Sequence, residues 1–142
     1  MAKPDQKLTV PLIFKVINEY AKDLQWSIHC MDAAGDLGEY LWMKIDYSIE
    51  HNIYGYETTW GELIWMSDRL YAVSDFVLIA CDRYEKMEYI ATTSKSFDEA
   101  KERYDMVVDI DDTRLYKIYC IDKKKEQKYN KLLAPLPRHV DQ

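Results

Sequence analysis

Two aspartates and a threonine stand at alternate positions and could act together in catalysis. Asp109, Asp111 and Thr113 lie in the run Val-Val-Asp-Ile-Asp-Asp-Thr that spans residues 107–113. Carboxylate oxygens bind hard divalent cations such as Mg²⁺, and a bound cation can assist the transfer of a phosphoryl group. The Asp109/Asp111 pair is therefore one candidate site, in a small enzyme that depends on a divalent metal.

The D-x-D-x-T spacing of this run resembles the nucleophile strand of haloacid-dehalogenase-like phosphatases, in which one aspartate attacks phosphorus and the next handles the leaving-group proton. That chemistry also needs a lysine and further acidic residues from a doubly wound sheet. The segment before Asp109 is predicted to be a helix rather than a long parallel strand, so we do not assign the chain to this family. A calcium loop is disfavoured as well, because Arg114 replaces its glycine and Cys120 its bidentate glutamate. We interpret residues 107–113 as an acidic turn, between a helix that ends near Met106 and a strand that starts at Arg114.

The histidines and cysteines show no metal-ligand spacing. No C-x-x-C or H-x-x-x-H pattern occurs, which argues against a structural zinc site. His29 and Cys30 are neighbours on a predicted strand and are expected on opposite faces, where they could not bind one metal together. Cys30, Cys81 and Cys120 are odd in number and lie in apolar runs, so we expect buried free thiols in a reducing compartment. We predict a cytoplasmic protein with no metal and no cofactor.

Length and composition indicate one globular domain. The chain has 142 residues, of which 48% are hydrophobic and 31% charged, and this is the composition of a folded protein. No apolar run approaches the roughly 18 residues that a membrane span needs. We assign residues 1–134 to a single domain. Pro135 and Pro137 follow its last helix, and residues 135–142 are predicted to be a loose C-terminal tail.

The net charge of −6 is unevenly distributed. Residues 123–142 carry six basic and two acidic side chains, so this segment is +4 and residues 1–122 are −10. An acidic body repels nucleic acid and suits a basic partner. The basic segment has two interpretations that stay open: it lies on the body and neutralises part of it, or its lysines between Lys123 and Lys131 bind nucleic acid.

Hydrophobic periodicity predicts the secondary structure. Amphipathic stripes and capping signals predict four helices, at residues 9–25, 59–71, 96–106 and 123–133. Alternation or short apolar runs predict five strands, at residues 26–31, 41–47, 76–81, 87–93 and 114–121. The predicted fold is α+β, with a mainly antiparallel five-stranded sheet and about four helices packed mostly on one face. The order of the strands in the sheet stays open.

The stretch 58–93 is the predicted centre of this fold. Residues 76–81, Phe-Val-Leu-Ile-Ala-Cys, are uniformly apolar between charged neighbours, which is typical of a strand buried on both faces. Before this strand, Thr59 and Glu62 have the spacing of a helix capping box. After it, residues 87–93 alternate in polarity, and we predict that they form a hairpin with the central strand.

Aromatic residues are numerous, with 12 Tyr, 4 Trp and 3 Phe. Most of them fall on predicted packing faces, and the exceptions are Trp42, Tyr54, Tyr56 and Trp65. Either a second layer of the protein covers these four side chains, or they form an interface with another protein. Both interpretations stay open.

We interpret the whole as a small, acidic, non-catalytic interaction protein. Immunity proteins of bacterial toxins and phage-encoded inhibitors of host machinery share this profile, being small, acidic, rich in aromatics and poor in motifs. The expected function is that of an inhibitor or antidote against a larger basic protein, such as a nuclease. The predicted contact residues are three aromatics with an acidic rim: Trp42, Tyr54, Tyr56, Asp46, Glu50 and Glu57. A metal-dependent enzyme using Asp109/Asp111 and a nucleic-acid binder using Lys123–Lys131 remain as alternatives; the partner's identity and a homo-oligomeric state stay open.

Overall fold

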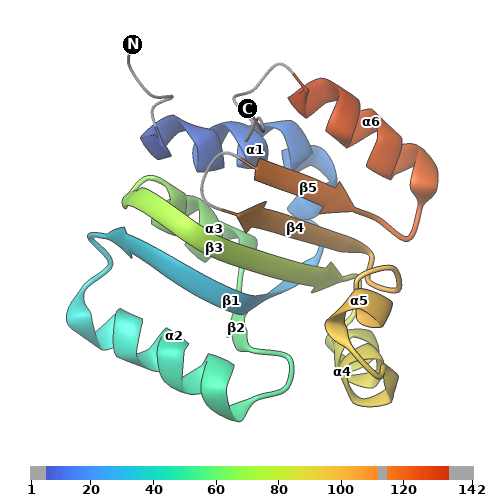
Figure 1. The fold of residues 1–142 in the computed structure, drawn as a ribbon, viewed down its shortest axis with the longest axis horizontal. Coiled ribbons are helices and arrows are strands. Elements are labelled where there is room, and N and C mark those ends of the chain that lie inside the picture. Colours follow the sequence, from blue (N-terminus) through green and yellow to red (C-terminus); the bar gives the residue numbers. More distant parts are fainter. Residues whose placement is uncertain (1–5, 112–114, 135–142) are drawn as a thin grey trace.

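Residues 6–111 and 115–134 are described by the computed structural model, and they form one sheet with helices around it (Figure 1). The helices of this part are α1 (Gln6–Ala21), α2 (Glu39–His51), α3 (Trp60–Ser67), α4 (Tyr84–Thr93), α5 (Phe97–Ala100) and α6 (Lys123–Leu133). The strands are β1 (Gln25–Gly35), β2 (Tyr56–Thr58), β3 (Leu70–Cys81), β4 (Met106–Asp111) and β5 (Leu115–Tyr119). None of the helices within the described ranges is long and apolar enough to cross a membrane.

The sheet has the order β2-β1-β3-β4-β5, and every neighbouring pair is antiparallel. This arrangement confirms the predicted α+β class and the predicted antiparallel sheet of five strands. The larger hydrophobic cluster lies where α1, α3 and α6 pack against the sheet, and α2 adds Ile45 to it along the β1 side. The smaller cluster lies on the opposite face, under α4 and α5. The predicted tail, residues 135–142, lies outside the described residues.

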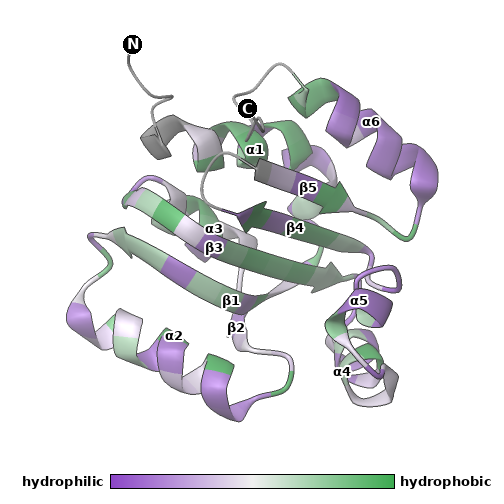
Figure 2. Cartoon of the chain, in the orientation of Figure 1, coloured by the Kyte–Doolittle hydropathy of each residue, from purple (hydrophilic) through white to green (hydrophobic). Residues whose placement is uncertain are grey.

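The second half of the central strand β3, residues 76–81, is buried on both faces, as its uniform apolar sequence predicts. Phe76, Leu78 and Ala80 belong to the larger cluster. Val77, Ile79 and Cys81 belong to the smaller one. Figure 2 shows this second half of β3 and the adjoining part of β4 coloured hydrophobic. The strand starts at Leu70, so the predicted helix 59–71 ends earlier, at Ser67.

Three aromatic rings join α1, β1 and α3 inside the larger cluster. The centroid of the Trp60 ring lies 4.9 Å from that of Phe14 and 5.2 Å from that of Trp26. Each indole nitrogen donates a hydrogen bond of 2.8 Å, from Trp26 to the carbonyl of Ala21 and from Trp60 to the side chain of Asn18. Both partners lie on α1, so the rings fix this helix against the sheet.

The predicted capping box of Thr59 and Glu62 forms in part. The Thr59 hydroxyl accepts a hydrogen bond of 3.0 Å from the backbone N–H of Glu62, and α3 begins where the box predicts. The Glu62 carboxylate accepts from the hydroxyl of Thr58, at 2.6 Å, rather than from the amide of Thr59. Ser96 and Glu99 have the same spacing, and the Ser96 hydroxyl caps the four-residue helix α5.

The predicted strand 41–47 is wrong, because these residues form the middle of α2. Leu41, Ile45 and Ile49 are four residues apart and pack inward, which is the spacing of one helix face. Within residues 41–47, however, Leu41, Met43, Ile45 and Tyr47 stand at every second position, so the segment also fits the alternation of a strand. The helix starts after Gly38, whose positive φ of 90° lets the chain turn away from β1.

The predicted strand 87–93 is also wrong, because it lies in α4. Met87 and Ile90, three residues apart, are buried, whereas Tyr89 is 61% exposed. The predicted hairpin partner of β3 is therefore absent at this position. The strand that pairs with β3 on this side is β4, which follows after α4 and α5.

The segment 107–111 is not a turn but most of strand β4. The predicted helix 96–106 ends at Ala100, and the chain reaches β4 through a short connection. Val107, Val108 and Ile110 are fully buried between β3 and β5. β-Branched residues favour strands, and here burial on both faces adds to that preference. Thr113 and Arg114 lie outside the described residues.

A buried carboxylate ties the end of β3 to the start of β4. The side chain of Asp105 accepts a hydrogen bond of 2.8 Å from the backbone N–H of Asp82. It also accepts from the ammonium group of Lys86, at 3.0 and 3.1 Å to its two oxygens. Lys86 lies on α4, so one side chain holds together the turn after β3, the helix and the next strand.

Helix α6 has the predicted bounds and covers the outer edge of β5. The side chain of Asp122 caps the helix by accepting from the backbone N–H groups of Lys124 and Lys125. The side-chain amide of Asn130 accepts from the N–H of Ile118, at 3.2 Å, and donates to its carbonyl, at 2.8 Å. The N–H of Cys120 donates to the carboxylate of Glu126, at 2.9 Å. Side chains of α6 thus take the place of a further strand.

Candidate functional site

The outward side of α2 carries three large side chains that no other part of the described chain covers. Tyr40, Met43 and Tyr47 are 79%, 63% and 64% exposed. They are spaced by three and four residues, so they lie in one row along the helix. A shallow hollow lies among them, lined also by Lys44 and Ser48. We call Tyr40, Met43, Tyr47 and His51 the α2 outer face.

His51 holds the far end of this face in place. Its ring stacks on that of Tyr47, with centroids 4.0 Å apart and planes at 18°. Its Nδ1 lies 2.8 Å from the carbonyl oxygen of Tyr47, which restrains the imidazole further. Ordering an exposed side chain costs conformational entropy when a partner binds. The stacking reduces that cost at Tyr47.

Acidic side chains flank the α2 outer face. Glu39, Asp46 and Glu50 are exposed on the same helix, against one lysine, Lys44. The ammonium group of Lys44 lies 5.9 Å from the centre of the Tyr56 ring. The local charge is therefore negative, in agreement with the net charge of the chain.

The structure separates the six predicted contact residues into two sets. The carboxylates Asp46, Glu50 and Glu57 are exposed. Trp42 is half-buried against the larger cluster, and the buried Tyr56 donates a hydrogen bond to Glu62.

Tyr54 is half-buried, and its ring meets that of Tyr84 edge-on at 5.2 Å. Trp65, the fourth aromatic whose coverage stayed open, is partly exposed beneath the guanidinium of Arg69. The protein itself therefore covers much of the aromatic part of the predicted surface.

The exposed residues of α2 escaped prediction because the strand assignment placed two of them inside. Met43 and Tyr47 alternate with polar residues, and on a strand they would share the inner face with Leu41 and Ile45. The signal that identifies the helix is Ile49, which extends the inner stripe by a further four residues. Once the helix is assigned, Tyr40, Met43 and Tyr47 fall on its opposite side.

The two aspartates of the candidate metal site lie on β4. Asp109 pairs with Val77, and Asp111 pairs with Asp75 on the neighbouring strand β3. No group of three or more His, Cys, Asp or Glu residues is arranged to hold a metal ion in the part of the chain that the structure describes. β4 is antiparallel to both of its neighbours, whereas the phosphatase resemblance requires a parallel sheet. Burial, followed by the charges of Asp111 and Asp75, raises the pKa of Asp109.

We expect Asp109→Asn to stabilise the protein at neutral pH. A carboxyl group with a raised pKa in the folded state is less favourable when ionised, so its cost appears as pH rises through that pKa. Asparagine removes this charge and its repulsion from Asp111 and Asp75. The thermal midpoint of the variant should exceed that of the wild type at pH 7, and the difference should vanish as pH falls below the ordinary aspartate pKa. A lower midpoint at pH 7 would instead mean that the charge is stabilised by a group such as Lys101.

Part of the basic C-terminal segment lies on the body of the protein. Lys123 contacts Glu102 of the body at 2.8 Å, and within the segment it also contacts Glu126 at 3.1 Å. Lys125 lies 4.4 Å from the centre of the Tyr20 ring. These contacts agree with the interpretation in which the segment neutralises part of the acidic body.

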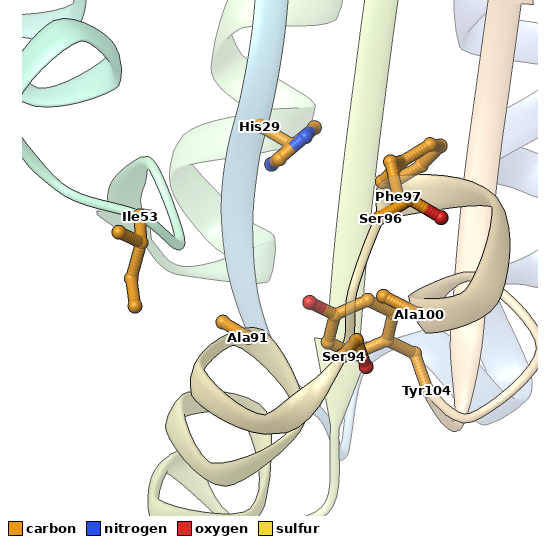
Figure 3. A pocket seen from close by; sticks show the side chains of 8 residues that line it. All are labelled: His29, Ile53, Ala91, Ser94, Ser96, Phe97, Ala100 and Tyr104. Atoms are coloured by element: carbon orange, nitrogen blue, oxygen red, sulfur yellow. The ribbon is translucent and has the colours of Figure 1, made fainter.

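A second hollow lies on the opposite side of β1 from the larger cluster, and Figure 3 shows the side chains that line it. It is formed where β1 irregularly pairs with β3: Ile28 pairs with Leu78 and Cys30 with Val77, so His29 is an extra residue. Such a bulge turns two successive side chains toward one face. His29 stacks on Phe97, and Cys30 packs on the same smaller cluster. The expectation that His29 and Cys30 face opposite sides is therefore wrong.

Comparison with protein-family models, with curated proteins and with solved structures finds no significant match to this chain. Its function therefore has to be inferred from its own surface. Two features of the described residues that could serve a function are the α2 outer face and the hollow beside His29.

Proposed function

We propose that this protein is a non-catalytic interaction protein that binds a larger basic protein through the α2 outer face and acts as its inhibitor or antidote. The observation that carries the proposal is the row of Tyr40, Met43 and Tyr47, more than 60% exposed on one side of a helix. Tyrosine and methionine are enriched at the buried centres of protein interfaces. Adjacent exposed residues of this kind mark interaction sites more often than scattered ones do.

The partner's charge follows from the flanks of this face. Glu39, Asp46 and Glu50 lie along one side of the row, and the whole chain has a net charge of −6. Complementary charge speeds association and excludes acidic competitors. A basic partner, for example a protein that itself binds nucleic acid, is therefore favoured. The free cysteines Cys30, Cys81 and Cys120 fit a cytoplasmic site of action, where thiols stay reduced.

The geometry favours binding by a helix that fits into a groove. Side chains at spacings of three and four residues lie on one side of a helix. They can therefore enter a hydrophobic groove of the partner together. The inner side of α2 is fixed by Leu41, Ile45 and Ile49. The row is thus displayed on a rigid element, and little ordering is needed on binding.

Tyr47→Ala should weaken binding to the partner by about 2 kcal/mol, or roughly thirtyfold in Kd, mainly through faster dissociation. The partner is first recovered from lysate of the native cell on immobilised protein, then purified and measured by calorimetry or surface plasmon resonance. Tyr89→Ala is the matched control, because Tyr89 is equally exposed but lies on α4. It should change Kd less than twofold.

Two outcomes would contradict this site. Equal losses from Tyr47→Ala and Tyr89→Ala would mean that exposed tyrosines act non-specifically. Unchanged binding in Tyr47→Ala combined with Met43→Ala would place the interface elsewhere on the protein. Circular dichroism of each variant shows that α2 remains folded.

Glu50→Lys should slow association with the basic partner severalfold at low salt and leave the dissociation rate nearly unchanged. Glu50 is exposed at the rim of the α2 outer face, so its charge acts over a distance rather than through a buried contact. Dissolved ions screen such effects within about 10 Å at 0.1 M salt. The difference should therefore shrink as salt rises. An effect that is independent of salt would make Glu50 a direct contact.

The same assays separate the two competing functions. Asp109→Asn should leave partner binding unchanged, whereas loss of function in this variant with its fold retained would favour the metal-dependent enzyme. Retention on DNA or RNA that falls steeply with salt, and that needs the lysines of α6, would favour a nucleic-acid binder.

A further inference from the structure

The hollow beside His29 is a separate cavity of about 220 Å³ with its own set of polar groups. It lies between the bulge of β1, the residues that follow α2, and the α4–α5 segment (Figure 3). It is smaller than the roughly 300–1,000 Å³ of a drug-sized site. A single substituted ring is the largest group that such a space accommodates well.

One wall of this pocket is aromatic and held in place. The rings of His29 and Phe97 stack with centroids 4.7 Å apart and planes at 14°. β-Bulges are over-represented next to binding sites, where they re-aim a side chain. Here the bulge directs the imidazole of His29 onto the face of the sheet that carries the smaller hydrophobic cluster. Burial lowers the pKa of His29, so the ring presents one N–H donor and one acceptor at neutral pH.

The floor of the pocket carries the hydroxyl group of Tyr104. Tyr104 is 2% exposed, and its hydroxyl has no hydrogen bond to any of the described residues. Figure 3 shows this hydroxyl directed into the space between His29 and Ala91. A hydroxyl that faces the open space of a pocket can bond to water, and a ligand that binds there replaces that bond. Burial raises the pKa of Tyr104 to about 12, so the group remains an O–H donor.

Two serines at the rim add further donors. The Ser94 hydroxyl accepts a hydrogen bond of 2.8 Å from Arg103, and the Ser96 hydroxyl accepts one of 3.3 Å from the N–H of Glu99. Because these bonds use their oxygens as acceptors, each serine retains its own proton for donation. The pocket therefore offers hydroxyl donors at its rim and floor, and each hydroxyl can also accept. None of the described residues that line it is charged.

We propose that this pocket binds a small neutral ligand built on one ring that carries a hydrogen-bond acceptor, such as an aromatic amide or a nucleobase. The ring packs among the apolar side chains beside His29 and Phe97. Its carbonyl oxygen or ring nitrogen accepts from the hydroxyl of Tyr104 and from a serine at the rim. A charged ligand is disfavoured, because no lining side chain compensates the loss of its hydration.

The test uses benzamide as the probe, with benzoate and benzamidine as anionic and cationic analogues of the same shape. Benzamide is titrated into the isotope-labelled protein while the ring signals of His29 and Tyr104 are followed by NMR. These signals should shift in a saturable way, with Kd on the order of 1 mM for so small a ligand. The two charged analogues should bind at least about tenfold more weakly.

Variants of the lining residues test whether benzamide binds in this cavity. Tyr104→Phe removes only the hydroxyl, and it should weaken benzamide binding about fivefold. Ala91→Leu fills the cavity from α4 and should abolish the saturable shift. Thr92→Leu adds the same side chain at the exposed neighbouring position and should leave binding intact. Circular dichroism confirms that each variant is folded.

Three results would overturn the proposal. The first is the lack of a saturable shift at His29 and Tyr104 up to about 20 mM benzamide, well above the expected Kd. The second is benzamide binding that survives Ala91→Leu. The third is benzoate or benzamidine binding as tightly as benzamide, which would reject a neutral ligand. None of these results depends on the protein partner of the α2 outer face.

Discussion

Trp26→Ala should lower the free energy of unfolding by about 3–5 kcal/mol, the range for removing a large buried aromatic side chain. Trp26 is 1% exposed and lies between β1 and the helices α1 and α3. Its loss opens a cavity against Trp60 that close-packed neighbours fill only in part. The carbonyl of Ala21 also loses its buried donor. Both effects act in the same direction.

Urea unfolding followed by circular dichroism measures this change. Trp65→Ala is the matched control, because Trp65 is partly exposed and should cost less than about 1 kcal/mol. If Trp26→Ala costs no more than Trp65→Ala, the aromatic cluster around Trp60 does not hold α1 to the sheet. A variant too unstable to purify would agree with the prediction, and Trp26→Phe then provides a measurable intermediate.

Asp105→Ala should lower the free energy of unfolding by about 2–3 kcal/mol. The change leaves the N–H of Asp82 without its acceptor and Lys86 without its main partner. Both hydrogen bonds are part-buried, so solvent replaces the lost bonds only in part. The three segments that this carboxylate joins should then unfold more readily.

A double-mutant cycle separates the ion pair from the backbone hydrogen bond. Lys86→Met should cost less than Asp105→Ala, and the double variant should cost less than the sum of both. Additive costs would mean that Lys86 and Asp105 do not interact.

The pH range of the ion pair follows from Lys86. Burial by itself would lower its pKa, but the hydrogen bond and charge of Asp105 raise it above the usual 10.5. On the alkaline side, the contribution of Lys86 to the pair is therefore fully present at neutral pH and is lost as pH rises through that raised pKa.

The fold was predictable from the sequence where one signal outweighed the others. The run 76–81 is apolar throughout, so only a doubly covered strand accommodates it, and β3 does so. Asp122 caps a helix whose predicted bounds, 123–133, are those of α6. β2 has only three residues and pairs through its backbone, so no side-chain pattern marks it.

The candidate site was harder to predict because it breaks the pattern on which prediction depends. Polar residues are expected on the outer side of a surface helix. On α2, Met43 and Tyr47 occupy that side, and their apolar character made the segment resemble an alternating strand. The bulge at His29 was equally hidden, since it depends on how β1 pairs with β3, a strand nearly fifty residues away. Local departures from sequence rules are expected at functional positions.

The contacts of Asn130 have a consequence for self-association. A strand at the edge of a sheet can recruit a strand from another copy of the chain and so start a growing fibre. The carboxamide of Asn130 has the same donor and acceptor as a peptide group, and it occupies both backbone groups of Ile118. Glu126 occupies the next outward N–H, that of Cys120. Helix α6 thus protects the outer edge of β5 from pairing with another chain. If α6 detached, the backbone groups of β5 would be free to pair with a strand of a second copy, and aggregation could begin there.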